Sequence, residues 1–142
     1  MIILDTNVLS ALMRTSPDLA VVHWLDTQAA QSVWITSVTL FEVRFGIGLL
    51  PASKRRRSLE AAFDRLLAED LEYRIAEFDA AAATEAAALA AARQKKGRTV
   101  DLRDTQIAGI ALARRATLAT RNARHFADLD VSVSDPWRGG RA

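Results

Sequence analysis

The sequence predicts an α/β fold with a mainly parallel sheet, and two observations carry this prediction. Short apolar runs without polar alternation recur along the chain, as expected of strands that helices cover on both faces. Longer segments with helical apolar spacing separate them, and this alternation favours parallel strands joined by right-handed crossovers. The 142 residues suffice for one core, and no internal repeat or Pro/Gly/Ser-rich linker divides them. We expect a single domain over 1–137 and a frayed tail at 138–142.

The expected strands are short and mainly apolar. The first opens the chain at residues 1–4 and leads directly into Asp5. Similar runs follow at 32–35, 73–75, 117–120 and 131–133. They predict a central sheet of four or five strands.

Three segments carry the strongest helix signals. Between 53 and 69, apolar residues recur at helical spacing opposite Arg and Glu. Residues 79–95 are mostly alanine, which combines high helix propensity with little bulk and allows close packing against a neighbour. Residues 101–115 form a third amphipathic helix, with two arginines where a helix C-terminus favours positive charge. Shorter helices are expected after each of the first two strands.

Composition narrows the class of protein. The chain has no cysteine, which excludes disulfides, thiolate metal sites and a cysteine nucleophile, and favours a cytoplasmic setting. Its apolar stretches are too short to span a membrane, and we find no targeting signal. The net charge of +2 permits nucleic-acid contact without requiring it. Basic residues gather at 54–57, at 95–98, and around Arg121 and Arg124.

Asp5 is the first candidate for chemistry, because ligands of open α/β sheets gather outside the carboxyl ends of the strands. It directly follows the first expected strand. Two explanations remain open here: Asp is a good helix N-cap, and a carboxylate at the sheet edge can hold a metal ion.

Glu42 lies among apolar residues in SVTLFEVRFG, in or near the first turn of the helix after the second strand. Thr36, Ser37 and Thr39 are possible caps of that helix. A first-turn glutamate can merely complement the helix dipole. A carboxylate enclosed by Leu, Phe and Val is costly, however, unless it is charge-paired or binds a cation.

Two further acids, Asp101 and Asp104, stand three residues apart in RTVDLRDTQIAG. Asp101 has the better claim to be the N-cap, and Asp104 can point from the first turn toward the same sheet edge. Asn122 follows the fourth strand and by itself reads as a cap or turn residue. Such an oxygen-rich set favours Mg²⁺ or Mn²⁺ over zinc or copper.

Together these segments resemble PIN-domain ribonucleases, in particular the VapC-type and FitB-like toxins of bacterial toxin–antitoxin pairs. The similarity covers nearly the whole chain. It rests on ILDTNVLS at 3–10, TSVTLFEVRFGI at 36–47, RDTQIAGIAL at 103–112, LATRNARHF at 118–126 and VSDPW at 133–137. The resemblance implies a three-layer α/β/α sandwich and a Mg²⁺-dependent endoribonuclease that acts as a toxin.

The resemblance also assigns residues. Asp5, Glu42 and Asp104 would bind one or two Mg²⁺ or Mn²⁺ ions that support RNA cleavage. Many relatives have a fourth acid where this chain has Asn122. We include Asn122 in the catalytic set. Its amide oxygen can bind or orient a water, but it is a weaker ligand for a second metal ion than a carboxylate. Thr6, Asn7 and Thr120 would orient the ligands, with Thr6 or Asn7 also left to cap the next helix.

The implied partners are RNA, a second copy of the chain and a small VapB-type antitoxin, which alone would contact DNA. Of the basic clusters, the one around Arg121 and Arg124 lies nearest the site in sequence, on either side of Asn122 and Ala123, and would hold RNA phosphates. Segments 53–69 and 20–25 are candidates for the antitoxin surface, although ordinary core packing accounts for most of their apolar residues. Lys54–Arg57 is read as solvated helix surface.

Two other hypotheses remain. Asp5 could be a phosphoryl-accepting nucleophile, but such phosphatases carry a second aspartate where this chain has Asn7. Alternatively, the loss of an acid at Asn122 could mark a non-catalytic PIN-like module that binds RNA or a protein partner. His23 and His125, the two histidines, are not expected to act as a catalytic base.

Overall fold

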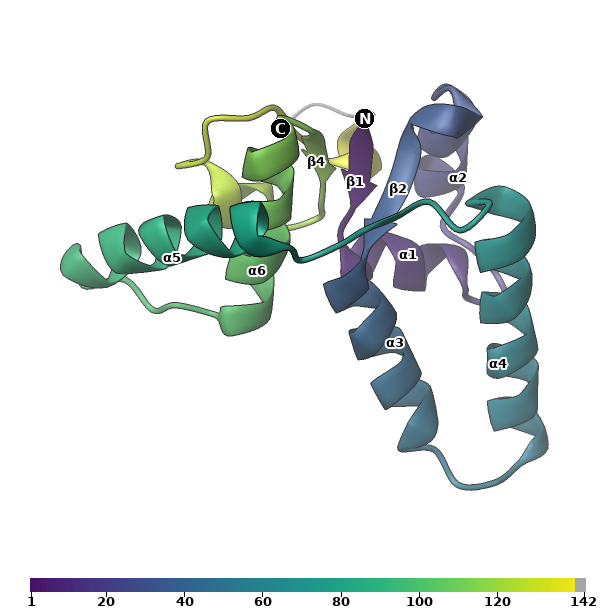
Figure 1. The fold of residues 1–142 in the computed structure, drawn as a ribbon. Helices are drawn as coiled ribbons and strands as arrows, with labels where there is room; N and C mark the ends of the chain where they lie inside the picture. The colour runs from purple at the N-terminus through teal and green to yellow at the C-terminus, as the bar shows by residue number, and fades with distance from the viewer. Residues whose placement is uncertain (140–142) are drawn as a thin grey trace.

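The computed structural model describes residues 1–139, which form three layers: a central sheet with a layer of helices on each face (Figure 1). Within these residues the sheet has five strands in the order β3-β2-β1-β4-β5, and all four pairings are parallel. The strands are β1 (Ile2–Leu4), β2 (Val33–Thr36), β3 (Ile75–Ala76), β4 (Thr117–Ala119) and β5 (Val133–Ser134). The α/β class and the parallel sheet expected from the sequence are confirmed.

The described residues contain six α-helices, which lie on both faces of the sheet. They are α1 (Thr6–Leu12), α2 (Leu19–Asp26), α3 (Ser37–Gly48), α4 (Lys54–Arg65), α5 (Ala80–Lys95) and α6 (Leu102–Arg114). A π-helical turn, η2 (Leu66–Asp70), extends α4, so the long helix expected at 53–69 is present. Short 3-10 helices follow β4 and β5: η3 (Ala123–Phe126) and η4 (Pro136–Arg138).

The predicted tail begins inside an ordered element, because Arg138 belongs to η4. Gly140–Ala142 lie outside the described residues, and the fraying expected there stays a prediction. Within residues 1–139, no helix combines the length and the apolar character needed to cross a membrane.

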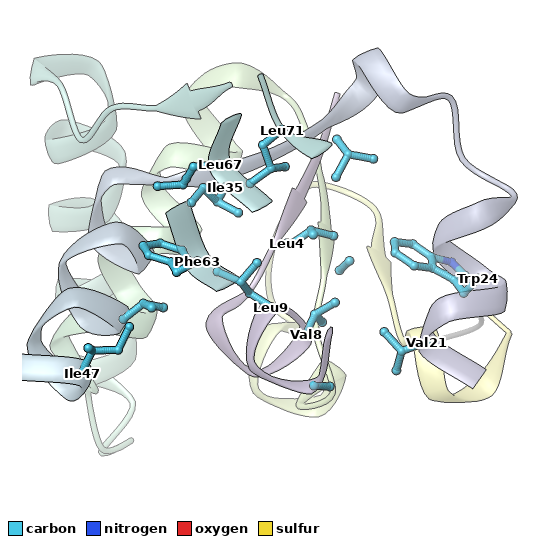
Figure 2. Packing of buried hydrophobic residues seen from close by; sticks show 14 residues of the cluster. Leu4, Val8, Leu9, Val21, Trp24, Ile35, Ile47, Phe63, Leu67 and Leu71 are labelled. Carbon is cyan, nitrogen blue, oxygen red and sulfur yellow. The ribbon is translucent and has the colours of Figure 1, made fainter. Parts of the chain in front are cut away.

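Neighbouring residues of the central strands enter two different cores, because side chains alternate across a sheet. Leu4 packs in the cluster covered by α1, α2, α3 and α4, part of which is drawn in Figure 2. Ile3 packs on the opposite face, against α5 and α6. Phe63, Val21 and Trp24 are buried in the first cluster. The apolar faces of 53–69 and 20–25 are therefore mainly core, as ordinary packing predicts.

Close packing of α5 on α6 depends on small residues, as the alanine-rich sequence predicts. Gly109 of α6 lies against the backbone of α5, and a Cβ at this position would come 2.5 Å from the carbonyl oxygen of Ala82. It would also stand 2.6 Å from Cβ of Ala86. Glycine therefore permits the two helix backbones to approach to this distance.

Strand order determines where a site can form. β1 lies between β2 and β4, so the chain builds one half of the sheet and then crosses to the other side of β1. In such sheets the ligand crevice opens outside the carboxyl ends of the strands, where the strand order reverses. Here that point is between β1 and β4, and the backbone N–H of Asp5 donates to the carbonyl of Ala119 at 2.8 Å.

Candidate metal centre

Asp5 lies at the carboxyl end of β1 and is 3% exposed. It is itself the N-cap of α1, since its Oδ1 accepts a hydrogen bond from the backbone N–H of Thr6 at 2.8 Å. The expectation that Thr6 or Asn7 caps this helix is therefore wrong: α1 begins immediately after the strand, which leaves only Asp5 in the cap position. The helix cap and the candidate metal ligand are therefore the same side chain.

The second oxygen of Asp5 is held by groups from two other elements. The hydroxyl of Thr120 donates to Oδ2 at 2.8 Å, and Nδ2 of Asn7 donates to the same oxygen at 3.4 Å. The Thr120 hydroxyl accepts from the backbone N–H of Asn122 at 3.1 Å, and Asn7 Oδ1 accepts from the backbone N–H of Arg121 at 3.2 Å. Burial raises the pKa of the Asp5 carboxyl, while the hydrogen bonds from Thr120 and Thr6 oppose the rise.

The sequence interpretation places Glu42 in or near the first turn of its helix, and the structure places it just beyond, in the second turn of α3. The reason is that α3 begins directly at the end of β2, with Thr36 as N-cap accepting from the N–H of Thr39 at 3.0 Å. This position weakens the dipole explanation for Glu42, because the helix-terminus effect fades within the first turn. Thr6 donates its hydroxyl to Oε1 of Glu42 at 2.9 Å.

Arg103 is a charged neighbour of Glu42 that the sequence analysis missed. Its Nη1 lies 3.7 Å from Oε2 of Glu42. The guanidinium also lies over the rings of Phe41 and Phe45, 5.5 and 5.8 Å from their centroids. Its position directly before Asp104 was the available signal, because a residue next to a site acid on a helix can reach the neighbouring helix that carries another acid.

Asp101 and Asp104 divide their roles as the sequence predicts. Asp101 is the N-cap of α6, and its Oδ1 accepts from the backbone N–H of Asp104 at 3.0 Å. Asp104 lies in the first turn. Burial, followed by the negative charges of Asp5, Asp101 and Glu42, raises the pKa of Asp104 to about 6. The cost of ionising Asp104 is an electrostatic sign that these carboxylates lie near one another.

A single cavity of about 400 Å³ gathers most of the predicted site residues. Thr120 lies beneath it as a buried hydrogen-bond partner of Asp5, and Arg124 lines an adjoining cavity instead. Neither histidine lines the acid cavity. Its walls include four residues that the sequence analysis did not select, namely Ser10, Ala11, Arg14 and Trp137. The selected residues that line it are Asp5, Thr6, Asn7, Glu42, Asp104, Arg121 and Asn122.

Arg14 carries only a weak signal in the sequence. It stands seven residues after Asn7, a spacing that brings residues of one helix to the same face. However, α1 ends at Leu12 and Arg14 lies past it, where the chain bends, so the tertiary structure places Arg14 at the cavity. It adds a positive charge to the wall of the acid cavity.

The donor set fits a hard divalent ion in chemistry and location. Asp5, Glu42 and Asp104 offer only oxygen, and they share one cavity at the switch point of the sheet. Among residues 1–139, no three Asp, Glu, His or Cys side chains already converge closely enough to enclose a metal ion. Mg²⁺ normally keeps several waters and uses one or two carboxylates directly, so an open arrangement of acids is compatible with it.

Comparison with known families identifies the class of protein that this fold and cavity represent. The sequence model of the PIN-domain family matches residues 2–131 of this chain. The chain therefore belongs to the PIN-domain family, and the resemblance read from the five sequence motifs is confirmed.

Particular relatives narrow the comparison. The chain is 34% identical to VapC ribonuclease Y4jK of Sinorhizobium fredii over 137 residues, covering 96% of this chain and 98% of the relative. It is 33% identical to Toxin FitB of Neisseria gonorrhoeae, covering 96% and 99%. The solved structure of FitAB bound to a DNA fragment matches with a TM-score of 0.87 at 33% identity, covering 96% of each chain.

Proposed function

We propose that this protein is a divalent-metal-dependent endoribonuclease that acts as the toxin of a toxin–antitoxin pair. The observation that carries the proposal is the meeting of Asp5, Glu42 and Asp104, from three separate helices or helix caps, in one cavity at the switch point of the sheet. The names of the VapC ribonuclease and FitB relatives support the same reaction and role.

In this proposal Asp5, Glu42 and Asp104 hold Mg²⁺, or Mn²⁺ as a substitute. The bound ion would supply Lewis acidity, which stabilises charge developing on the phosphate and makes water a better nucleophile. Thr120 and Asn7 orient the Asp5 carboxylate, and Thr6 orients Glu42, by the hydrogen bonds described above. Asn122 presents an uncharged amide to the cavity and can position water or a substrate oxygen.

RNA is the proposed substrate because the walls of the acid cavity also carry positive charge. Arg14 and Arg121 both line it, and within residues 1–139 neither forms an ion pair with an acid. Carboxylates alone would repel RNA, so flanking arginines are needed to hold the phosphates.

We also propose a homodimer, as the family resemblance implies, and a small antitoxin that contacts DNA, by analogy with the FitAB complex bound to a DNA fragment. The chain has exposed apolar surface for a second copy on α3 and α6, where Phe41, Phe45 and Leu102 are 56%, 47% and 69% exposed. The two phenyl rings are stacked, with centroids 5.8 Å apart. A clustered aromatic surface of this kind is typical of protein interfaces.

Cleavage of a labelled single-stranded RNA tests the reaction. The wild type should cut in Mg²⁺ or Mn²⁺ and stop in EDTA, while Asp5→Asn, Glu42→Gln and Asp104→Asn should each lose at least about a hundredfold in rate. Glu85→Gln, an exposed acid on α5, is the matched control and should cut normally. Equal cleavage by all variants, or cleavage that EDTA leaves unchanged, would overturn the proposal.

Substitution of Asn122 distinguishes the enzyme hypothesis from that of a non-catalytic binding module. If the wild type is inactive while Asn122→Asp cuts RNA in Mn²⁺, the chain is a binding protein that has lost one acid. If the wild type already cuts, that alternative is excluded. A beryllofluoride adduct on Asp5 would instead favour the phosphoryl-transfer hypothesis.

A further inference from the structure

A second cavity, of about 630 Å³, adjoins the acid cavity. It lies between η3, the segment after it and β5, and it shares Arg121 and Asn122 with the acid cavity. A polymer that places one phosphate among the acids therefore has a hollow for its neighbouring unit immediately beside it. The volume falls within the range of about 300–1,000 Å³ that is usual for small-ligand sites.

The lining of this second cavity combines an apolar surface with cations. The half-buried Leu129, Val131 and Val133 supply apolar side chains, and the buried Phe126 lies behind them. Three arginines line the same hollow: Arg121, Arg124 and Arg138. An unpaired nucleotide has the complementary chemistry, since its base has apolar faces and its phosphate is anionic.

The one acid in the lining is engaged in local structure. Asp135 is 7% exposed and caps η4, with Oδ1 accepting from the backbone N–H of Trp137 at 2.9 Å. Its other oxygen lies 3.9 Å from Nε of Arg138. Three arginines against one aspartate leave the lining positive, in contrast to the neighbouring acid cavity.

Arg121 stands at the boundary of the two cavities and packs on Trp137. Its guanidinium lies over the ring of Trp137, 4.8 Å from the centroid. A cation–π contact orients the side chain without neutralising its charge. Arg121 can therefore bind a phosphate that lies between the acids and the second cavity.

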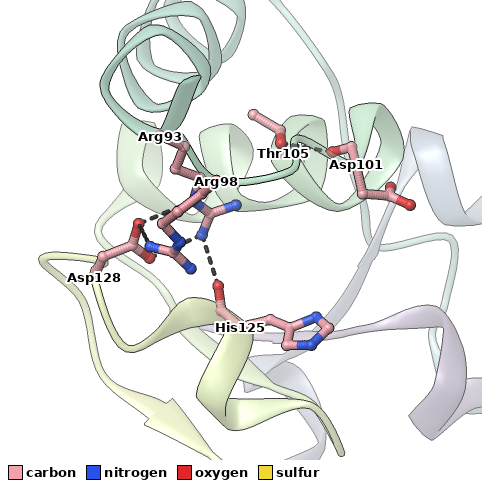
Figure 3. A network of polar contacts seen from close by, with 6 residues as sticks. All are labelled: Arg93, Arg98, Asp101, Thr105, His125 and Asp128. Carbon is pink, nitrogen blue, oxygen red and sulfur yellow. Dashed lines mark hydrogen bonds and ion pairs between the residues drawn. The ribbon is translucent and has the colours of Figure 1, made fainter. Parts of the chain in front are cut away.

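The wall formed by η3 is held in place from outside, as Figure 3 shows. Arg93 of α5 is 6% exposed and donates to both oxygens of Asp128 at 2.9 and 2.8 Å, and to the carbonyl of His125 at 2.7 Å. Arg98 adds a bond to Asp128 at 3.0 Å. These contacts, here called the clamp, all lie within the protein and hold this wall, so less ordering entropy is lost on binding.

We propose that this second cavity is a nucleotide subsite, which takes the unit of a single-stranded RNA next to the phosphate in the acid cavity. The inference rests on the proposed ribonuclease function and adds the adjoining unit of the substrate, with Arg124 and Arg138 as phosphate contacts. An acidic protein segment could use the same cations, but the junction with the acid cavity favours a continuous phosphodiester chain.

The test measures binding in EDTA, so that it does not depend on cleavage. Fluorescence anisotropy with a single-stranded RNA of about 12 nucleotides compares the wild type, Arg124→Ala/Arg138→Ala and Arg57→Ala. Arg57 is an exposed arginine of α4 that lines neither cavity. The double variant should weaken binding at least about tenfold and lower the salt slope by about one to two, while Arg57→Ala stays within about twofold.

A second set of RNAs locates the base. A single abasic position moved along the RNA should weaken binding at one or two adjacent positions, and this pattern should disappear in the double variant. An acidic peptide is titrated in parallel. The proposal is overturned if the double variant behaves as Arg57→Ala does, if abasic positions have no effect, or if the double variant loses affinity for the acidic peptide and keeps its affinity for RNA. Wild-type binding without cleavage would contradict the ribonuclease proposal and leave the subsite supported.

Discussion

The hydroxyl of Thr120, after β4, donates a 2.8 Å hydrogen bond to Oδ2 of Asp5, after β1. The bond joins the two strands between which the sheet order reverses, and both side chains are buried. Asp5 is thus oriented by a group that lies 115 residues away in sequence.

We predict that Thr120→Val lowers Mn²⁺ affinity about tenfold or more, because the Asp5 carboxylate loses the bond that orients it and favours its charged form. The variant should also lose about 1–3 kcal/mol of stability, since it leaves buried polar groups unpaired. Calorimetric Mn²⁺ titration and urea unfolding measure the two effects. Thr120→Ser keeps the hydroxyl and should stay near wild type; a Thr120→Val protein with unchanged Mn²⁺ affinity would contradict the prediction.

Stability without metal should fall as pH rises through the range from about 4 to 6. Asp104 has a pKa of about 6 in the folded protein, above its ordinary 3.8, so the folded state holds more protons in this range. The unfolding free energy should therefore decrease with pH and level off above about 7, and Mn²⁺ should stabilise more at pH 7.5 than at pH 5.

Urea unfolding in EDTA and in Mn²⁺ at both pH values makes this measurement. Asp104→Asn should weaken the metal-free pH dependence, because one of the two carboxyls with a raised pKa, Asp104 and Asp5, is gone, and it should reduce the stabilisation by Mn²⁺. A metal-free unfolding free energy of the wild type that increases from pH 4 to 6, or an Asp104→Asn protein with the same pH profile as the wild type, would contradict this prediction.

Gly109→Ala should destabilise the protein by about 2–4 kcal/mol, because a methyl group would overlap backbone atoms of α5 that cannot move alone. Gly46→Ala is the control: it lies in α3, a Cβ added there would meet no atom within 4 Å, and it should be neutral or stabilise by up to about 1 kcal/mol. Thermal and urea unfolding compare the two. Equal stability of both variants would mean that α5 can shift away from α6.

The Arg93–Asp128 pair should make the fold sensitive to acid. Hydrogen bonds from Arg93 lower the pKa of Asp128 to about 2, so its stabilisation is complete above about pH 4 and is lost as pH falls toward 2. Allowing for solvent screening of this partly exposed side chain, the loss should be about 1 kcal/mol.

Asp128→Asn should remove that acid-sensitive part and also weaken RNA binding, because η3 loses its clamp to α5. Urea unfolding between pH 2 and 7 gives the first effect and RNA anisotropy the second. Asp64→Asn, which breaks an exposed pair with Arg44, is the comparison and should change neither. If the unfolding free energy of Asp128→Asn depends on pH as that of the wild type does, Asp128 is not the source of the acid sensitivity.

The proposed dimer should depend on the aromatic surface of α3. Light scattering should give twice the 15.5 kDa monomer mass for the wild type. Phe41→Lys should shift the protein to monomer, because it places an unpaired charge in an apolar interface. Leu19→Lys changes an apolar residue on α2 that is even more exposed than Phe41, 70% against 56%, and should leave the dimer intact. A monomeric wild type, or a dimeric Phe41→Lys protein, would refute this interface.

Local sequence pattern was sufficient for the elements and for most of the cavity lining. The apolar runs around Ile3, Val33 and Leu118 predicted parallel strands, because only burial on both faces removes polar alternation. The alanine content of α5 predicted its close approach to α6. Asp5, Glu42 and Asp104 were selected because acids after or beside apolar strands face the edge at which ligands bind.

The remaining features arise from contacts between residues that are distant in sequence, which local pattern does not encode. Arg103 reaches Glu42 only because α6 packs beside α3, and Arg124 enters the second cavity because the clamp on Asp128 sets the direction of η3. Glu42 lies in the second turn and not in the first because α3 begins directly after β2, without a loop.

By itself, then, the sequence determined the fold class, the family and the acids, because burial periodicity and motif spacing are properties of short segments. Only the tertiary structure decided that Asp5, the candidate metal ligand, is also the cap of α1, which arginines flank the acids, and that a second, positively charged cavity adjoins them. Hydrogen-bond partners and cavities depend on how segments are placed in three dimensions, and that placement is set by the strand order and by the packing of helices on the two faces of the sheet.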